Sequence, residues 1–173
     1  IVYAIDFSEA FDTVRHSELL GKYLRMELQD CVYNWLVDFF RAHTHCSRFG
    51  GVESEFIAIS ASIIQGSAAG PASYVVAGSD LRPLTPGNSM VKFADDTYLV
   101  IPASNRESCA EEIKHVENWA SSNNLRLNHV KSMEIAFVSP RCRRAVVIPA
   151  PAVPTIPRVE EIKALGVTIS RKF

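Results

Sequence analysis

The chain has 173 residues, of which 47% are hydrophobic and 21% are charged, a balance typical of a globular protein and unlike a disordered or fibrous one. Its 18 basic and 19 acidic residues give a formal net charge of -1, which excludes a strongly basic chain that wraps around nucleic acid. The four cysteines form no CxxC pair, so they fit neither a zinc ribbon nor a disulfide scaffold and favour a reducing compartment.

In the first half of the chain, the pattern of apolar residues predicts a strand, two helices, a hairpin and a further helix. Residues 1–5 are a continuous apolar run, typical of a strand buried on both faces. Apolar residues three and four positions apart predict one helix over residues 15–28 and a second, capped by Asp30, that extends to residue 40. A hairpin that turns at Gly50-Gly51 is expected within residues 44–64, followed by a helix over residues 67–81 that Ser67 caps.

The second half predicts more strands around one helix. Two short strands are expected within residues 90–101, with Asp95 and Asp96 at the turn between them, and then a helix capped by Ser104 or Asn105. The apolar face of this helix is expected to comprise Cys109, Ile113, Val116 and Ala120. Strands over residues 133–138 and 164–169 flank a proline-rich loop at residues 149–157. This order predicts a single α+β domain over residues 1–173, an antiparallel sheet with helices packed on one face.

No membrane association is expected from the sequence. The uncharged stretch over residues 56–79 is long enough to span a bilayer. However, it holds serines, glycines and a proline, which make it a poor hydrocarbon-facing helix. Acidic residues at positions 6, 9 and 12 argue against an apolar targeting segment. Because the chain begins within a strand and without methionine, we expect it to be a piece of a longer protein.

Three aspartates occupy positions where a carboxylate is costly. Asp6 ends the buried strand, and Asp95 and Asp96 are adjacent in a hairpin, where two like charges repel unless a cation lies between them. If residues 1–6 and 91–100 are neighbours in one sheet, the three carboxylates converge and suit two divalent ions that promote phosphoryl transfer. The alternative is a solvated turn and a helix cap, the usual places for aspartate.

Five segments carry a resemblance to a known family. They are DFSEAFDTV, IIQGSAAGP, FADD, WASSNNLRLNHVKS and ALGVTIS, and they run in this order from Ile1 to about Ser170. Together they resemble the reverse transcriptase domain of non-LTR (LINE-type, jockey-like) retrotransposons. The resemblance implies a polymerase-palm-like sandwich with RNA-directed DNA polymerase activity, with fingers upstream of the chain and a thumb downstream. It also implies an RNA template, a DNA primer and dNTPs as partners, and an intracellular location, nuclear or cytoplasmic.

The same resemblance assigns roles around the reacting phosphate. Asp6, Asp95 and Asp96 would hold two Mg²⁺ ions, for which Mn²⁺ is a possible substitute, and the Phe7 carbonyl would be a further ligand. Lys131 would protonate pyrophosphate as a general acid or pair with a phosphate, although a solvated surface lysine is an equally good interpretation.

Nucleotide and primer contacts are implied as well. Phe11 would be the aromatic steric gate that excludes a 2′-hydroxyl, or it is an ordinary core phenylalanine. Gln65 and Gly66 would pack under the incoming nucleotide, or they form a plain glycine turn. Leu165 and Gly166 would belong to a hairpin that grips the primer, or to an edge strand.

Other functions compete with this interpretation. The chain departs from the second motif at Ser62, Ile64, Ala68 and Ala69. The alternative hypothesis is therefore a catalytically inactive palm, at most a nucleic-acid or protein interaction module, and we expect the isolated chain to extend a primer poorly or not at all. A nucleotidyl cyclase, which also uses paired carboxylates on a hairpin, does not account for Phe11 or for Gln65-Gly66. Zinc is not expected, because His43, His45 and Cys46 lack a second ligand pair at finger spacing.

Overall fold

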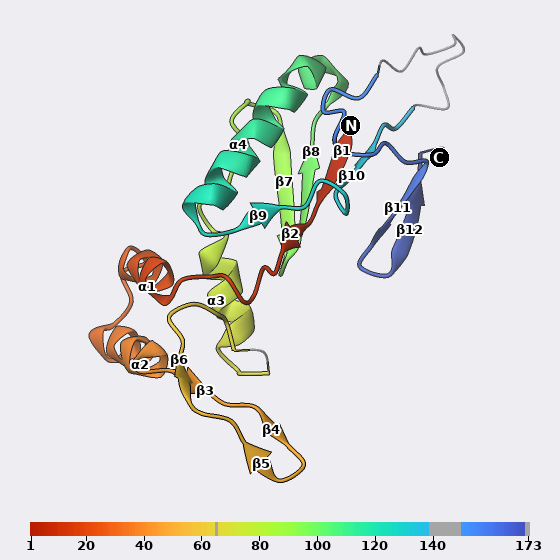
Figure 1. Cartoon of the computed structure of the whole chain (residues 1–173). Helices are drawn as coiled ribbons and strands as arrows, with labels where there is room; N and C mark the ends of the chain where they lie inside the picture. Colours follow the sequence, from red (N-terminus) through yellow and green to blue (C-terminus); the bar gives the residue numbers. More distant parts are fainter. Residues whose placement is uncertain (65, 139–149, 172–173) are drawn as a thin grey trace. The chain divides into compact units, whose positions relative to one another are not determined.

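The computed structural model describes residues 1–64, 66–138 and 150–171, and it contains two compact units. The first, called the sheet unit here, combines Ile1–Ser8 with Asp80–Phe173. The second, the hairpin unit, is the intervening segment Glu9–Ser79. Figure 1 draws both units, coloured along the chain.

A four-stranded antiparallel sheet with the order β10-β1-β8-β7 forms the centre of the sheet unit (Figure 1). The strands are β1 (Val2–Ile5), β7 (Ser89–Phe93), β8 (Asp96–Val100) and β10 (Met133–Ile135). Strand β1 pairs on one side with β8 and on the other with β10, both of them distant in sequence. Antiparallel strands combined with helices confirm the predicted α+β class.

The two faces of β1 differ in burial. Tyr3 and Ile5 are 0% and 3% exposed, whereas Val2 and Ala4 are only half-buried. The prediction of a strand buried on both faces is therefore wrong. Successive side chains of a strand point to opposite faces, so one face of the sheet belongs to the core and the other is more open.

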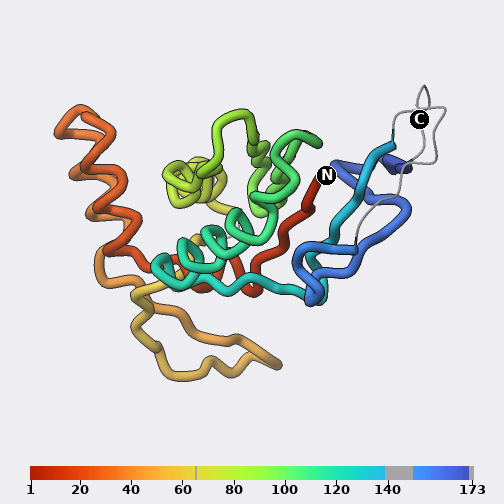
Figure 2. Tube along the Cα trace, turned by 90° about the horizontal axis from the view of Figure 1, so that it is seen from above, coloured from red at the N-terminus to blue at the C-terminus, as the bar shows by residue number. Residues whose placement is uncertain are grey.

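Helix α4 (Cys109–Ser122) lies beside this sheet (Figures 1 and 2), and a 3₁₀ turn, η1 (Ala103–Ser108), leads into it. All four residues of its predicted apolar face are at most 1% exposed, which confirms the helical stripe. The predicted caps are wrong: the residue before the helix is Ser108, which makes no side-chain cap. Asn105 instead donates to the carbonyl of Pro86, because η1 carries it away from the start of α4.

Two short strand pairs complete the sheet unit. Strand β2 (Phe7–Ser8) pairs with β9 (Arg126–Leu127), and β11 (Glu161–Ala164) pairs with β12 (Val167–Ser170). The single strand predicted over residues 164–169 is wrong. Leu165 and Gly166 have φ values of 47° and 84°, and two successive positive φ angles turn the chain into a tight hairpin.

Glu134 of β10 anchors the segment that follows the predicted proline-rich loop. It is fully buried, accepts a hydrogen bond from the Tyr3 hydroxyl at 2.8 Å and from Arg158 Nε at 2.6 Å, and forms an ion pair with the Arg158 guanidinium. Its backbone also bonds to Pro157 and Val159. Residues 150–157 of that loop contain no helix or strand, yet Ile156 is 1% exposed, so an apolar side chain fastens it as well.

Glu112 of α4 holds a second irregular segment. Its buried carboxylate accepts hydrogen bonds from the backbone N–H groups of Leu84 and Thr85 at 3.1 and 2.7 Å, and from the Asn88 amide at 2.8 Å. Burial alone would raise the pKa of Glu112, but these hydrogen bonds stabilise the charged form more, and the pKa lies below its ordinary value. The carboxylate thus accepts the backbone hydrogen bonds of this loop, as a neighbouring strand would in a sheet.

The hairpin unit contains three helices, each close to where the residue pattern predicts one. They are α1 (His16–Leu24), α2 (Asp30–Phe40) and α3 (Gly70–Ala77). Asp30 is the first residue of α2 rather than its cap, which is Gln29. Helix α3 is shorter than predicted, and Ser67 does not cap it: the Ser67 hydroxyl donates to the carbonyl of Ile64 at 2.8 Å. The Gly70-Pro71 pair begins the helix instead, since proline suits the first turn.

The predicted hairpin turns at Gly50-Gly51, whose φ angles are 59° and 81°. Its strands are short and paired in the order expected of one long hairpin: β3 (Thr44–His45) with β6 (Ile57–Ala58), and β4 (Arg48–Phe49) with β5 (Val52–Glu53). All eight strand residues are exposed. Across the described ranges of the chain, no helix is both long and apolar enough to cross a membrane.

Candidate active site

Asp6 directly follows β1, and Asp96 is the first residue of β8, the strand with which β1 pairs. Strands β1 and β8 pair antiparallel with Ala4 opposite Tyr98 and Ile5 opposite Thr97, and the next step of that register sets Asp6 opposite Asp96. The expectation that residues 1–6 and 91–100 are neighbours in one sheet is confirmed. By strand alternation, both aspartates belong to the more open face, opposite the buried residues Tyr3 and Leu99.

The turn between β7 and β8 differs in detail from the prediction. Phe93 pairs with Asp96, so the two turn residues are Ala94 and Asp95, and Asp96 is the first residue of β8. Ala94 has a φ of 51°, in the left-handed region that an alanine adopts only at a cost in free energy. This strained turn places Asp95 beside the strand end that carries Asp96, and both side chains are exposed.

The three carboxylates influence one another electrostatically. Partial burial raises the pKa of Asp96 above its ordinary value, and the negative charges of Asp95 and Asp6 raise it further. Repulsion of this kind requires the three groups to be close together. Within the part of the chain that the structure describes, however, no group of three His, Cys, Asp or Glu side chains is already arranged to hold a metal ion.

The backbone of Asp6 is fastened by a turn that the sequence analysis did not single out for this purpose. The Asp6 N–H donates to Ser132 Oγ at 3.0 Å, and the Asp6 carbonyl accepts from the Asn128 N–H at 2.9 Å. The Ser132 N–H in turn donates to the carbonyl of Asn128 at 2.8 Å, which closes the turn. Asn128 and Ser132 are therefore positioning residues for Asp6, and their place within the fourth motif was the only available signal.

Lys131 lies within this same turn. Its backbone N–H donates to Asn128 Oδ1 at 3.2 Å, and its side chain is exposed. The turn bonds to Asp6 on both sides, so Lys131 lies close in space to the aspartate although 125 positions separate them in sequence, the difference between 131 and 6. Sequence spacing could not show this proximity.

Phe7 belongs to the core of the sheet unit. It is 8% exposed, and its ring lies 5.9 Å from that of Trp119, centroid to centroid, at a tilt of 57°. Leu165 and Gly166 form the exposed tip of the β11-β12 hairpin. The hairpin that the resemblance implies at this place is thus present in the sheet unit.

Phe11 and Gly66 belong to the hairpin unit. The Phe11 ring is half-buried and stacks on Tyr74 of α3, with centroids 4.5 Å apart and an interplanar angle of 29°. Gly66 is exposed with a φ of 82°, a conformation that glycine adopts without strain. Gln65, the other residue predicted to contact the nucleotide, lies outside the described residues.

Comparison with known proteins agrees with the motifs. The sequence model of the family described as reverse transcriptase (RNA-dependent DNA polymerase) matches residues 1–169. The chain is also 27% identical, over 182 residues, to the RNA-directed DNA polymerase from mobile element jockey of Drosophila melanogaster. This alignment covers 98% of the chain but 19% of the relative, so the chain spans about a fifth of that protein's length. With the match over nearly its whole length, the chain belongs to the reverse transcriptase (RNA-dependent DNA polymerase) family.

Proposed function

We propose that this chain carries the catalytic carboxylates of an RNA-directed DNA polymerase, on a palm-like sheet whose core face packs against α4. In this proposal the chain adds dNTPs to a primer 3′-hydroxyl on an RNA template. The observation that carries it is the pairing of β1 with β8, whose last partners, Ile5 and Thr97, are the immediate neighbours of Asp6 and Asp96. Family membership supports the reaction class, and the strand register of β1 with β8 supports the choice of Asp6 and Asp96 as site residues.

Asp6, Asp95 and Asp96 are the residues that would hold two divalent ions. Carboxylate oxygens are the ligands that Mg²⁺ and Mn²⁺ prefer. The pKa of Asp96 is raised by partial burial and further by the negative charges of Asp95 and Asp6, which a bound cation would offset. When bound, two such ions lower the pKa of an attacking hydroxyl and neutralise the leaving pyrophosphate. The chemistry of this donor set therefore fits the metals.

The neighbouring residues position these groups. Asn128 and Ser132 hold the backbone of Asp6, which keeps its carboxylate at the end of β1. We assign Lys131, in the same turn, the role of pairing with or protonating the pyrophosphate. Positioning and charge stabilisation account for most of the catalysis in phosphoryl transfer, so a rigid turn at this place contributes directly to rate.

The remaining assignments concern substrates. We propose that Phe11 selects against a 2′-hydroxyl, that Phe7 offers its backbone carbonyl to a metal, and that Gln65 and Gly66 line the nucleotide site. Leu165, with Gly166 beside it, would contact the primer. A glycine at the tip of a hairpin lets a nucleic-acid backbone approach closely, which supports the last assignment.

Mn²⁺ binding tests the proposal on the chain itself. Electron paramagnetic resonance of free Mn²⁺ during titration measures how many ions the chain takes up. We expect binding by the natural chain and a loss of at least about tenfold in affinity for Asp96→Asn and for Asp6→Asn, because each removes a charged ligand. Asp38→Asn is the matched control, since it removes an exposed aspartate of the other unit, which forms an ion pair with Arg41 at 3.4 Å.

The outcome separates the proposal from its alternative. Equal losses for Asp96→Asn and Asp38→Asn, or no binding by the natural chain, would leave the catalytically inactive palm as the better description. If binding depends on Asp6 and Asp96, nucleotide addition to a primer annealed to RNA then tests the reaction, with Asp96→Asn as the inactive reference.

A further inference from the structure

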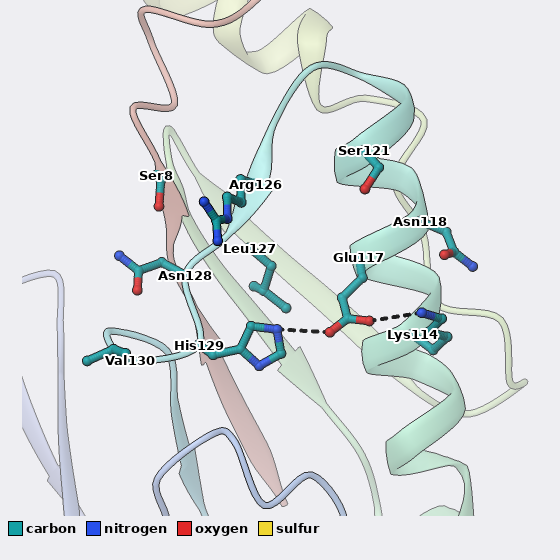
Figure 3. A pocket seen from close by; sticks show the side chains of 10 residues that line it. All are labelled: Ser8, Lys114, Glu117, Asn118, Ser121, Arg126, Leu127, Asn128, His129 and Val130. Carbon is teal, nitrogen blue, oxygen red and sulfur yellow. Dashed lines mark ion pairs between the residues drawn. The ribbon is translucent and has the colours of Figure 1, made fainter.

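A polar pocket of about 470 Å³ lies in the sheet unit between α4, β9 and the turn that follows β9 (Figure 3). Its walls include Ser8, Lys114, Glu117, Arg126, Asn128 and His129. Most of the lining belongs to the first and fourth motifs, but none of the residues to which the family resemblance assigns a role lines the pocket, so the proposed chemistry does not explain its composition.

The charges of the pocket leave one cation without an acidic partner. Glu117 forms ion pairs with His129 Nε2 at 2.9 Å and with Lys114 Nζ at 3.5 Å (Figure 3), so its negative charge is already shared between two basic groups. Arg126 is exposed, and no ion pair joins it to an acidic group among the residues that the structure describes. The lining therefore has an excess of positive charge, in a chain whose formal net charge is -1.

Neutral hydrogen-bond donors surround this positive charge. The Asn128 side chain and the Ser8 hydroxyl line the same cavity, and Figure 3 shows Ser121 and Asn118 on its α4 wall. A guanidinium with nearby amide and hydroxyl donors is the arrangement that recognises a phosphate oxygen. The lining contains no Phe, Tyr or Trp side chain, and its one aromatic ring, the imidazole of His129, forms an ion pair with Glu117.

We propose that this pocket binds a backbone phosphate of a single-stranded nucleic acid, with Arg126 as the primary contact. The choice of a nucleic-acid strand as the source of the phosphate rests on the proposed function, whereas the anion site itself rests on the pocket. The proposed contact is to a backbone phosphate, which carries no base identity, so it does not depend on base sequence. Asn128 connects the two sites, since its side chain lines the pocket while its backbone N–H holds the carbonyl of Asp6 at 2.9 Å.

Strand binding is measured by fluorescence anisotropy of a short labelled single-stranded RNA at several salt concentrations, with the 173-residue chain. Each neutralised phosphate of a single strand contributes about 0.7 to the slope of log K against log salt. Arg126→Gln should therefore reduce the slope by about 0.7 and weaken binding roughly fivefold at about 0.1 M salt. Arg82→Gln is the matched control: it removes the same charge from an exposed arginine of the same unit that lies outside the pocket, and it should change neither quantity.

A second variant pair predicts the opposite sign. Glu117→Gln removes the carboxylate that occupies Lys114 and His129, so it should strengthen RNA binding severalfold. Glu111→Gln removes an exposed carboxylate from the same helix, outside the pocket, and should have little effect. Both altered side chains in this pair are at the surface or in the pocket wall, which keeps the fold intact.

Equal effects of Arg126→Gln and Arg82→Gln, or no effect of either, would overturn the site. If inorganic phosphate shifts the NMR signals of the Arg126 and Asn128 side chains while the RNA does not, the strand assignment is wrong. Asp96→Asn should leave the Arg126-dependent slope unchanged, so failure of the metal centre and failure of this pocket are separate results.

Discussion

At the scale of single residues, the structure departs most from simple rules around buried charge. Glu112 is 0% exposed, yet its pKa lies below the ordinary value because Thr85, Leu84 and Asn88 donate hydrogen bonds to the ionised carboxylate. A buried carboxylate usually has a raised pKa, so the lowered pKa shows that these hydrogen bonds favour the charged form more than burial disfavours it.

This arrangement makes a prediction about pH. A folded-state pKa below the unfolded value of about 4.5 means that Glu112 contributes stability above that pH, and the contribution is lost as pH falls through the folded pKa. Glu112→Gln should therefore lower the free energy of unfolding by about 2 kcal/mol near neutral pH, the contribution of hydrogen bonds to a charged group. The difference from the natural chain should shrink on acidification, as measured by urea unfolding at several pH values. Glu111→Gln, its exposed neighbour, should show no such difference, and a gap that widens in acid would contradict the assignment.

For Phe11, the question is whether its ring selects the sugar of the nucleotide or only packs, because it already stacks on Tyr74. If Phe11 also excludes a 2′-hydroxyl, Phe11→Val should increase incorporation of ribonucleotides relative to deoxyribonucleotides by at least about tenfold in a polymerase assay. If the ring serves packing alone, the variant lowers the melting temperature and leaves the ratio unchanged. Tyr74→Leu, which disturbs the same stack from the other side, is the control for the packing effect.

At the scale of elements, one buried ion pair joins β10 to the segment after residue 150. Arg158→Met leaves the carboxylate of Glu134, which is fully buried, without its cation. We expect a loss of about 3 kcal/mol, because removing one partner of a buried pair leaves an uncompensated charge. Differential scanning calorimetry measures it. Arg171→Met breaks a pair with the exposed Glu160 and should cost less than about 1 kcal/mol. Similar losses for the two variants would show that burial of Glu134 does not control the energetics.

At the scale of the whole molecule, stability should differ strongly between the central sheet and the exposed hairpin. Leu99 of β8 is 0% exposed in the middle of the sheet, whereas Val52 of β5 is 72% exposed. Local opening of the β4-β5 hairpin exposes little additional apolar surface, so it requires less free energy than opening the sheet. Amide hydrogen exchange should protect Leu99 at least roughly a hundredfold more than Val52. Equal protection would indicate that the two units unfold together in a single step.

Sequence patterns predicted the elements better than their ends. The stripe of Cys109, Ile113, Val116 and Ala120 identified α4 because apolar residues that recur every three or four positions are typical of the buried face of a helix. The caps at Asp30, Ser67 and the start of α4 were wrong, since several polar residues near a helix start can each serve and local geometry selects among them.

The candidate site shows the same division. The motif order identified the aspartates, but the positions of Asn128 and Ser132 as supports for Asp6 depend on a turn folded onto β1 from more than 100 positions away. The hairpin at Leu165-Gly166 likewise required a positive φ at a leucine, which no propensity predicts. The fourth motif contains Arg126, but the sequence did not show that a pocket forms around it, because the lining residues come from β2, α4, β9 and the turn that follows β9.

The amino-acid sequence by itself determined the family and the α+β class and singled out the three aspartates as candidates, because short motifs and hydrophobic periodicity are local properties. Tertiary structure decided which face of the sheet those residues occupy, which turn supports Asp6, and where unpaired positive charge collects around Arg126. Each of these depends on strand register and on contacts between distant segments, whose free energy comes from burial and hydrogen bonding that only the folded chain makes.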